Sequence, residues 1–224
     1  MAEQQFLNGL DPDVRSRLLD RMKESTHKRD EVVISQNDES LDIFFVLDGH
    51  ARATGLSEEG KLVAYREIPE GAIFGELSAI DGRPRSANVV AVGPLKVGRI
   101  TQSDFRDLVD TDSAVRWALL DYLTAQHRAM TDRIFEFSTM LVRDRLIAEL
   151  LRLAEAAGAT EGRIELHPAP THFDLAARIS THREAVSREM SKFSRAKLVT
   201  KQLKTLIIHD VEALREQRED RSSH

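Results

Sequence analysis

The chain is organised around one stretch, Phe74-Gly75-Glu76-Leu77-Ser78-Ala79-Ile80-Asp81-Gly82-Arg83-Pro84-Arg85-Ser86-Ala87. A short helix that begins near Gly75 would point unpaired backbone N–H groups and a partial positive charge at one spot. Together with the guanidinium of Arg85, these groups would form an anion pocket. Glu76 would repel an anion unless it binds another part of the same ligand. Hydroxyl groups such as those of a ribose suit it, because an ionised carboxylate only accepts hydrogen bonds.

This stretch resembles the phosphate-binding cassette of cyclic-nucleotide-binding domains, in the run Phe-Gly-Glu-Leu-Ser followed by Arg-Pro-Arg-Ser-Ala. The resemblance implies that Glu76 accepts from the ribose 2′-hydroxyl. It also implies that Arg85 and Ser86, with backbone N–H groups near Gly75, hold the cyclic phosphate. The alternative is a β-turn that carries a surface Glu–Arg pair. The ligand-binding candidates in the cassette are Gly75, Glu76, Leu77, Ser78, Arg85, Ser86 and Ala87.

Composition narrows the class of protein. The 224 residues are 41% hydrophobic and 31% charged, which is typical of a soluble globular chain of one or two domains. The absence of cysteine excludes disulfides, thiolate catalysis, iron–sulfur clusters and zinc–cysteine sites. No apolar run reaches transmembrane length, and the first residues lack the basic and apolar regions of a signal peptide. We therefore expect a cytoplasmic protein with no membrane partner.

The N-terminal half changes from helix to strand. Asp11-Pro12 is a good helix start, and Val14, Leu18 and Met22 continue an apolar stripe to about Lys23. Short apolar runs follow and predict a β sandwich or barrel, with a jelly roll fitting their spacing and the cassette inserted into its wall. These runs are residues 32–34, 43–47, 51–53, 62–65 and 89–92, separated by turns at 48–49, 59–60, 70–71 and 93–94.

A long helix is predicted to follow, after a shorter one capped by Thr101. From about Thr111, apolar residues recur at alternating spacings of three and four, which is a heptad pattern. We interpret this seam as a parallel dimer coiled coil; the alternative is packing against the chain's own barrel. His127 in the seam is interpreted as structural or register-setting, with a metal or haem ligand as the alternative. The seam residues are Leu120, Leu123, His127, Met130, Ile134, Phe137 and Leu141.

The apolar pattern shifts phase after Phe137, so a hinge and domain boundary are expected near Ser138-Thr139. A further helix should end at Gly158, with a loop or short hairpin over 158–170. Residues 171–190 then read as helix, tight turn and helix, with the turn at Ser180–His182 and a capping box of Thr181 with Glu184. The expected buried positions are Phe173, Leu175, Ala176, Ile179, Val186, Met190 and Phe193.

The second of these helices exposes a polar face that suits DNA. The guanidinium of an arginine can donate two hydrogen bonds to O6 and N7 of guanine, and a glutamate can accept one from N4 of cytosine in the major groove. Residues 170–208 hold eight Lys or Arg against three Asp or Glu, a local charge of +5 on a chain of −5. The strands predicted at 198–200 and 205–208 would form a wing whose Lys201 contacts phosphates. Residues 212–224 are expected to form a frayed helix or to be disordered. The alternative is a helical hairpin with surface ion pairs.

The sequence Arg183-Glu184-Ala185-Val186-Ser187-Arg188 after this turn resembles the recognition helix of the CRP/FNR family of bacterial transcription regulators, and most of all that of the cAMP receptor proteins. The likeness extends from about residue 10 to residue 211. It implies a homodimer, a palindromic double-stranded DNA site with TGTGA-like half-sites, and RNA polymerase as a partner. Within the family, the lack of cysteine removes the iron–sulfur branch. The DNA-binding candidates are Thr181, His182, Arg183, Glu184, Ser187, Arg188 and Lys201.

The choice of ligand base depends on the long helix. Family members that respond to cAMP present hydroxyl residues to the purine, and aligning the helix by its end at Val142 puts Met130 and Thr131 there. Only Thr131 offers a hydroxyl, and it suits guanine as well as adenine. Both cAMP and cGMP therefore stay open as the allosteric ligand.

The sequence thus predicts an α+β chain with a jelly-roll cyclic-nucleotide-binding domain at 1–110, a dimerisation helix and hinge at 111–138, and a winged helix-turn-helix at 139–224. The expected function is a cyclic-nucleotide-responsive regulator. A regulator of the same build that senses another ligand, or none, is the alternative. A cupin-type enzyme is disfavoured because only His50 of the eight histidines falls among the strands, so no catalytic cofactor or metal is expected. A nucleotide-binding regulatory subunit without a DNA role is disfavoured by the basic C-terminal module.

Overall fold

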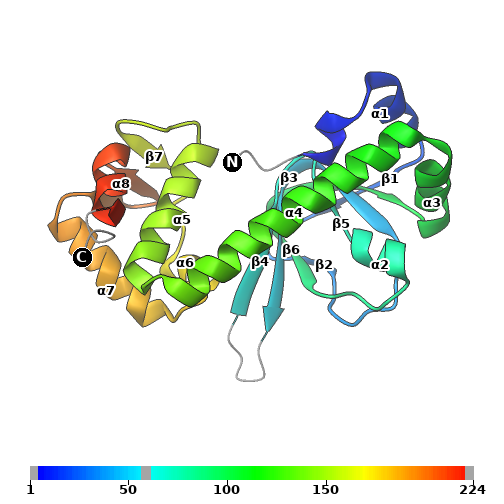
Figure 1. Ribbon diagram of the computed structural model, residues 1–224. Coiled ribbons are helices and arrows are strands. Elements are labelled where there is room, and N and C mark those ends of the chain that lie inside the picture. The colour runs from blue at the N-terminus through cyan, green and yellow to red at the C-terminus, as the bar shows by residue number, and fades with distance from the viewer. Residues whose placement is uncertain (1–4, 57–61, 220–224) are drawn as a thin grey trace. The chain divides into compact units, whose positions relative to one another are not determined.

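The computed structural model describes residues 5–56 and 62–219. Its contacts divide the chain into two compact units, Met1–Met130 and Thr131–His224. Strands and helices occur in both units, which confirms the expected α+β class (Figure 1).

The first unit is built on an antiparallel sheet. Its strands are β1 (Lys23–His27), β2 (Val32–Ile34), β3 (Ile43–Leu56), β4 (Leu62–Ile68), β5 (Ile73–Phe74) and β6 (Asn88–Ile100). They are ordered β1-β6-β3-β4, with β2 paired to β6 and β5 paired to β3. The alternating burial of β3 and β6 turns residues such as Phe45 and Val97 into the core.

Two of the predicted turns are wrong, because Asp48-Gly49 lies inside β3 and Gly93-Pro94 lies inside β6. The two strands pair across these sites with shifts of register on either side of Gly49. Gly49 has φ +87°, and a Cβ there would lie 2.3 Å from the carbonyl oxygen of Pro94. Glycine here permits close approach of two strands rather than a reversal of the chain. The turn predicted at 59–60 lies outside the described residues.

The helices of the first unit are η1 (Phe6–Gly9), α1 (Pro12–Leu19), α2 (Glu76–Asp81), α3 (Gln102–Thr111) and the N-terminal part of α4 (Ser113–Thr139). α1 ends at Leu19 rather than Lys23, where β1 begins, and Asp11 makes no side-chain cap. Thr101 does cap α3, because its hydroxyl accepts from the N–H of Asp104 at 3.2 Å.

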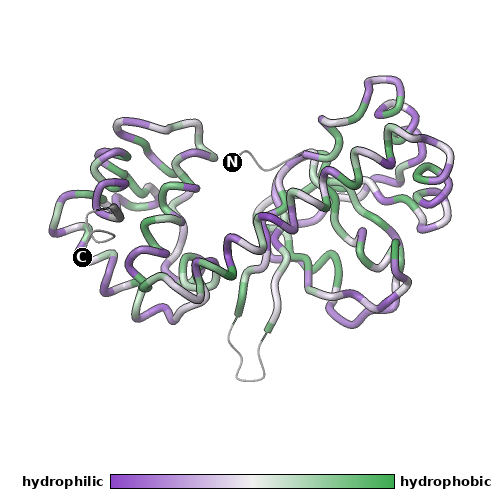
Figure 2. The backbone as a smooth tube through the Cα atoms, viewed as in Figure 1, coloured by the Kyte–Doolittle hydropathy of each residue, from purple (hydrophilic) through white to green (hydrophobic). Residues whose placement is uncertain are grey.

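The helix α4 has two apolar faces. Val115, Leu119 and Tyr122 on one face are buried in the core of the first unit. The predicted seam lies mainly on another face: Leu123 is half-buried, whereas Ile134 is 66% exposed. Leu120 and Met130 are also exposed, and green and purple segments alternate along the helix in Figure 2. The predicted seam extended too far, because α4 ends at Thr139 and Leu141 is the N-cap residue of α5. Packing against the first unit therefore accounts for little of the heptad pattern.

The second unit contains the end of α4, α5 (Val142–Ala156), α6 (His172–Arg178), α7 (Arg183–Arg195) and α8 (Val211–Glu219). Its sheet has the order β7-β9-β8, from β7 (Ile164–Leu166), β8 (Val199–Gln202) and β9 (Thr205–Ile208). The core lies between this sheet and the helices, as the apolar cluster around Leu146, Leu175 and Phe193 shows. The strands β8 and β9 pair in antiparallel fashion, which confirms the hairpin predicted from residues 198–200 and 205–208.

Some details of the second unit differ from the sequence expectation. Residues 211–219 form the helix α8, and its Val211 and Leu214 are buried in the core, so this part of the tail is a packed helix. Phe173, expected in the core, is 54% exposed. The capping box of Thr181 and Glu184 does not form, since α7 begins after His182 without a side-chain cap. Instead Thr171 and Asp174 form one at the start of α6.

Candidate functional site

The turn into the cassette requires glycine. Gly75 is the N-cap residue of α2 and has φ +81°, in the left-handed region. A Cβ on Gly75 would lie 2.5 Å from Nη1 of Arg85 and 2.9 Å from the carbonyl oxygen of Asp42. Both the backbone conformation and the lack of space therefore exclude larger residues. This turn brings Glu76, at the first position of the helix, next to the loop that carries Arg85.

Arg85 is buried beneath this turn and is only 2% exposed. Its Nη1 donates to the carbonyl of Gly75 at 2.9 Å, its Nη2 to the carbonyl of Asp42 at 2.6 Å, and its Nε to Oγ of Ser40 at 3.1 Å. Burial lowers the pKa of Arg85, opposed by the negative charges of Asp38 and Asp42. The guanidinium stays charged, since an arginine pKa lies far above neutral pH. An anion that binds here must exchange with carbonyl acceptors.

The other candidate ligand-binding residues of the cassette differ in how far they are exposed to solvent. Glu76 and Ser78 are buried, at 6% and 3% exposure. Leu77 is 48% exposed, Ser86 is exposed and Ala87 is half-buried. The structure thus brings Gly75, Glu76 and Arg85 together, and turns Leu77 away from them.

Sequence reasoning missed a polar network behind the cassette. Nη1 of Arg66, on β4, lies 3.8 Å from Oε1 of Glu76 and donates to the hydroxyl of Tyr122 at 3.0 Å. The carbonyl of Ile73 accepts from Nη2 of Arg66 at 2.9 Å and from the hydroxyl of Tyr122 at 3.0 Å. Burial raises the pKa of Tyr122 to about 12. No local signal marked Arg66, because its neighbours on β4 do not alternate between buried and exposed positions.

Residues expected to read the ligand base, Met130 and Thr131, are both exposed on α4. Met130 is the last residue of the first unit and Thr131 the first of the second.

The helix α7 presents the predicted polar face. Arg183, Glu184 and Arg188 are exposed, whereas Val186, Met190 and Phe193 are buried on the opposite side. His182 is exposed and Thr181 half-buried before the helix. The buried stripe fixes the rotation of the helix, so the charged side chains point to solvent.

Ser187, a predicted DNA-binding residue, already has a hydrogen-bond partner within the protein. Its Oγ lies 2.8 Å from Nδ1 of His172 on α6. Burial lowers the pKa of His172, and the positive charges of Lys201 and Arg183 lower it further. Those two cations therefore lie close enough to His172 to act on it, one from the wing and one from α7.

The turn of the wing, between β8 and β9, contains Leu203 and Lys204. Leu203 is 97% exposed and has φ +50°. Lys201 and Lys204 are exposed as well, so the hairpin displays one apolar side chain between two cations. A bulky residue in the left-handed region is uncommon and strained.

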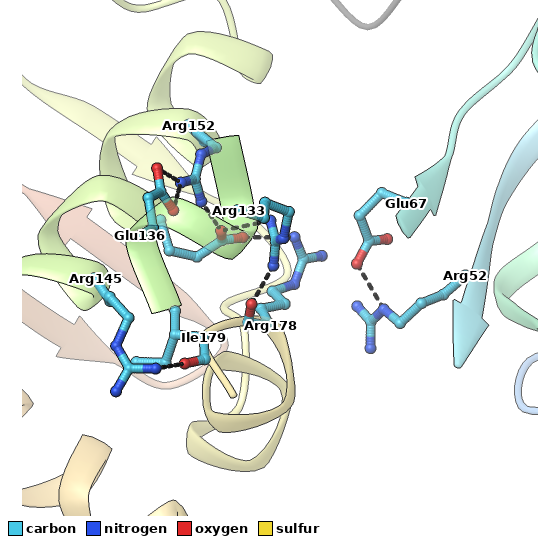
Figure 3. Close-up of polar contacts among 9 residues, drawn as sticks. Arg52, Glu67, Arg133, Glu136, Arg145, Arg152, Arg178 and Ile179 are labelled. Carbon is cyan, nitrogen blue, oxygen red and sulfur yellow. Dashed lines mark hydrogen bonds and ion pairs between the residues drawn. The ribbon is translucent and has the colours of Figure 1, made fainter. Parts of the chain in front are cut away.

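A buried carboxylate joins three helices of the second unit. Glu149 on α5 is 2% exposed and accepts from Nη1 of Arg152 at 2.5 Å and from Nη1 of Arg178 at 2.9 Å. Nη1 of Arg133, from the end of α4, lies 3.7 Å from it. Figure 3 shows the side chain of Arg133 reaching the backbone carbonyl of Arg178, to which it donates a hydrogen bond. The network ties the last turns of α4 to α5 and α6.

Glu136 adds a second carboxylate to this network by pairing with Arg152 (Figure 3). Burial alone would lower the pKa of Arg152, but the hydrogen bonds and charges of Glu136 and Glu149 outweigh it and raise that pKa. Burial lowers the pKa of Arg133, against the attraction of Glu149. Nearby, Nη1 of Arg145 donates to the carbonyl of Ile179 at 2.8 Å (Figure 3).

Within residues 5–56 and 62–219, no cluster of three or more His, Asp or Glu side chains is arranged to hold a metal ion. None of the helices in that part of the chain is long and apolar enough to cross a membrane.

A ligand-binding β domain followed by a helix-turn-helix defines a transcription regulator rather than an enzyme. The family model for a cyclic nucleotide-binding domain matches residues 24–112, and the model for a Crp-like helix-turn-helix domain matches residues 144–217. The chain belongs to the CRP/FNR family of transcription regulators.

Proteins of known sequence are similar to the whole chain or to part of it. The CRP-like cAMP-activated global transcriptional regulator of Mycobacterium tuberculosis is 19% identical over 215 residues, which are 96% of each chain. The cAMP-dependent protein kinase regulatory subunit of Blastocladiella emersonii is 28% identical over 109 residues, 49% of this chain and 27% of that protein. The chain therefore spans about a quarter of this second relative.

Two solved structures share the fold. The c-di-GMP responsive global regulator of Xanthomonas campestris has a TM-score of 0.77 at 16% identity, over 89% of this chain and 99% of that one. A CRP/FNR family regulator of Thermus thermophilus has a TM-score of 0.74 at 22% identity, over 88% of this chain and 98% of that one.

Proposed function

We propose that this chain is a homodimeric transcription regulator whose affinity for a palindromic DNA site is set by cAMP or cGMP bound in the cassette. The observation that carries the proposal is the burial of Glu76 and Arg85 at the turn formed by Gly75. A buried carboxylate and a buried guanidinium at one helix N-terminus match a ligand with hydroxyl groups at one end and an anion at the other.

In the proposed complex, phosphate oxygens replace the carbonyls of Gly75 and Asp42 as acceptors for Arg85. The exchange is favourable because a hydrogen bond between two charged groups is stronger than one to a neutral carbonyl. Backbone N–H groups at the start of α2, and Ser86, supply further donors. Glu76 accepts from the ribose 2′-hydroxyl, and Thr131 with Met130 contacts the base.

The exposed stripe of α4 supports the dimer. Leu120, Met130 and Ile134 recur at heptad positions and lie outside the described core of the first unit. Two copies would present their α7 helices to half-sites one helical turn apart, with Arg183, Glu184 and Arg188 at base edges and Lys201 at phosphates. The ligand acts by binding the DNA-competent state better than the other. Such a regulator works in the cytoplasm, with RNA polymerase as a further partner.

The proposed domain organisation has three parts. Residues 1–110 bind the ligand, residues 111–138 form the dimerisation helix and hinge, and residues 139–224 bind DNA. A regulator of the same build with another ligand, or none, is the alternative. Two similar proteins support this alternative, because their names give different ligands: one is cAMP-activated and the other is c-di-GMP responsive.

Calorimetric titration with cAMP, cGMP and c-di-GMP separates these alternatives. Arg85→Ala should weaken binding of the cyclic mononucleotide by about 2 kcal/mol, roughly thirtyfold, as expected for a lost charge-assisted pair. Arg99→Ala is the matched control, because Arg99 is exposed and contacts the side chain of Asp42, at 2.7 Å. Equal affinity in wild type and Arg85→Ala would show that the cassette is not the ligand site.

The DNA role is tested by fluorescence anisotropy on a TGTGA palindrome and on a scrambled duplex. Glu184→Ala should relax the preference for the palindrome more than it lowers total affinity, because Glu184 accepts from a base. Lys201→Ala should instead weaken both duplexes alike, as a phosphate contact does. If Glu184→Ala weakens both duplexes equally, Glu184 positions the helix and reads no base.

A further inference from the structure

The helix α4 reaches the cassette through polar contacts as well as apolar ones. Tyr122 is 2% exposed, and its hydroxyl donates to the carbonyl of Ile73, on the strand that leads directly into the cassette. Its ring packs edge-on against Phe6 at 6.0 Å between centroids. The side chain therefore has a fixed position, set by packing around the ring and by a hydrogen bond at its tip.

Arg66 connects this tyrosine to the ligand-binding carboxylate. One of its terminal nitrogens donates to the Tyr122 hydroxyl at 3.0 Å and lies 3.8 Å from Glu76; the other donates to Ile73 at 2.9 Å. The guanidinium also lies over the Tyr122 ring, 5.7 Å from its centroid. A single planar group thus faces α4, β5 and the first residue of α2.

These contacts are directional, which distinguishes them from the packing of Val115 and Leu119. An apolar contact changes little when a neighbour gains a ligand, whereas a hydrogen-bond network responds when one member acquires a new partner. A ribose hydroxyl that donates to Glu76 draws on the same carboxylate charge that attracts Arg66, whose Nη1 lies 3.8 Å from Oε1 of Glu76. The balance of Arg66 among Glu76, Tyr122 and the carbonyl of Ile73 then depends on whether the ligand is bound.

We propose that Arg66 and Tyr122 are positioning residues that transmit occupancy of the cassette to α4. The proposal rests on the proposed function and names the route by which the ligand would reach the dimerisation helix. Tyr122 supplies the contact on α4, and Arg66 makes its position depend on the partner of Glu76. Neither residue needs to touch the ligand.

The experiment uses the full-length protein and the Tyr122→Phe variant, with cAMP and cGMP as probes. Tyr65→Phe is the matched control, because Tyr65 is the other tyrosine of the chain and is 43% exposed. Calorimetry gives ligand affinity, and anisotropy on the TGTGA palindrome gives DNA affinity with and without ligand. Trp117, the single tryptophan, lies exposed on α4 and reports by fluorescence whether ligand binding reaches the helix.

We expect Tyr122→Phe to bind the nucleotide within about threefold of wild type, because Glu76 and Arg85 are intact. The ligand-induced gain in DNA affinity should fall by about fivefold, which corresponds to one hydrogen bond of ordinary strength. The Trp117 response to ligand should shrink in parallel. Arg66→Lys should likewise keep nucleotide affinity and lose part of the ligand-induced gain in DNA affinity. A lysine ammonium keeps the charge but lacks the planar guanidinium that reaches three partners at once. Tyr65→Phe should match wild type in all three measurements.

Two results overturn the inference, and they are distinguishable from failure of the proposed function. If both variants lose ligand affinity but keep the full DNA response at saturation, the two residues only shape the pocket. If both variants behave as wild type, the network carries no coupling. Failure of wild type to bind either cyclic mononucleotide would instead refute the proposed function, and this inference with it.

Discussion

Replacing Glu149 by Gln tests how much of the second unit's stability depends on one buried charge. The carboxylate is 2% exposed and accepts from Arg152 at 2.5 Å and Arg178 at 2.9 Å, with Arg133 at 3.7 Å. An amide of the same shape keeps one acceptor oxygen and turns an NH2 group toward a guanidinium. It also removes the negative charge that lies among three cations.

The magnitude follows from the contacts that are lost. One charge-assisted hydrogen bond contributes about 1.5–3 kcal/mol. Breaking a buried ion pair on one side costs about 3–5 kcal/mol, because the partner charges stay behind unpaired. Arg152 is 36% exposed and can turn to water or keep Glu136, which lowers the cost. We expect the free energy of unfolding of the second unit to fall by about 3 kcal/mol.

The assay is urea unfolding followed by far-ultraviolet circular dichroism, with hydrogen exchange of α5 and α6 amides to localise the change. Glu165→Gln is the matched control, because Glu165 pairs with Arg163 at a similar 2.6 Å in the same unit but is 54% exposed. That control should cost less than about 0.5 kcal/mol. Equal losses in the two variants, or a loss below about 1 kcal/mol for Glu149→Gln, would refute the argument from burial.

Three further measurements test other features. In a Tyr65→Phe background, absorbance titration should show the phenolate of Tyr122 forming near pH 12, because burial disfavours the charged form; ionisation near pH 10 would contradict its burial. Ile134→Asp should convert the proposed dimer to monomer in sedimentation experiments, since Ile134 is 66% exposed on the stripe of α4; an unchanged mass would place the interface elsewhere. The lowered pKa of His172 favours its neutral form in the folded state, so its contribution to stability is present above the unfolded pKa of about 6.5 and is lost as pH falls through the lower folded value. The slope of unfolding free energy between about pH 7.5 and about pH 5.5 should therefore be shallower in His172→Asn, and an identical slope would assign the pH dependence to other groups.

The cassette could be predicted because its signals are local. A glycine with positive φ, a helix start and a glutamate at the first helical position all follow from adjacent residues. The buried stripe of α7 could be predicted for the same reason, since Val186, Met190 and Phe193 repeat at helical spacing.

The remaining features depend on contacts between distant residues. Gly49 and Pro94 read separately as turns, and only their pairing across β3 and β6 explains them as a close approach of strands. The strand β1 carries no apolar alternation because its residues are almost all exposed at the sheet edge. Likewise, nothing in the local sequence around Arg66 indicates its hydrogen bond with Tyr122, which lies 56 positions along the chain.

The strained turn at the tip of the wing has a practical consequence for engineering. Leu203 contributes almost nothing to the core and occupies a conformation that glycine or asparagine adopts at little cost. Leu203→Gly should therefore raise the melting temperature of the protein, with no change to α7. A fluorophore attached at residue 203, where the side chain projects into solvent, would also report whether the wing meets DNA.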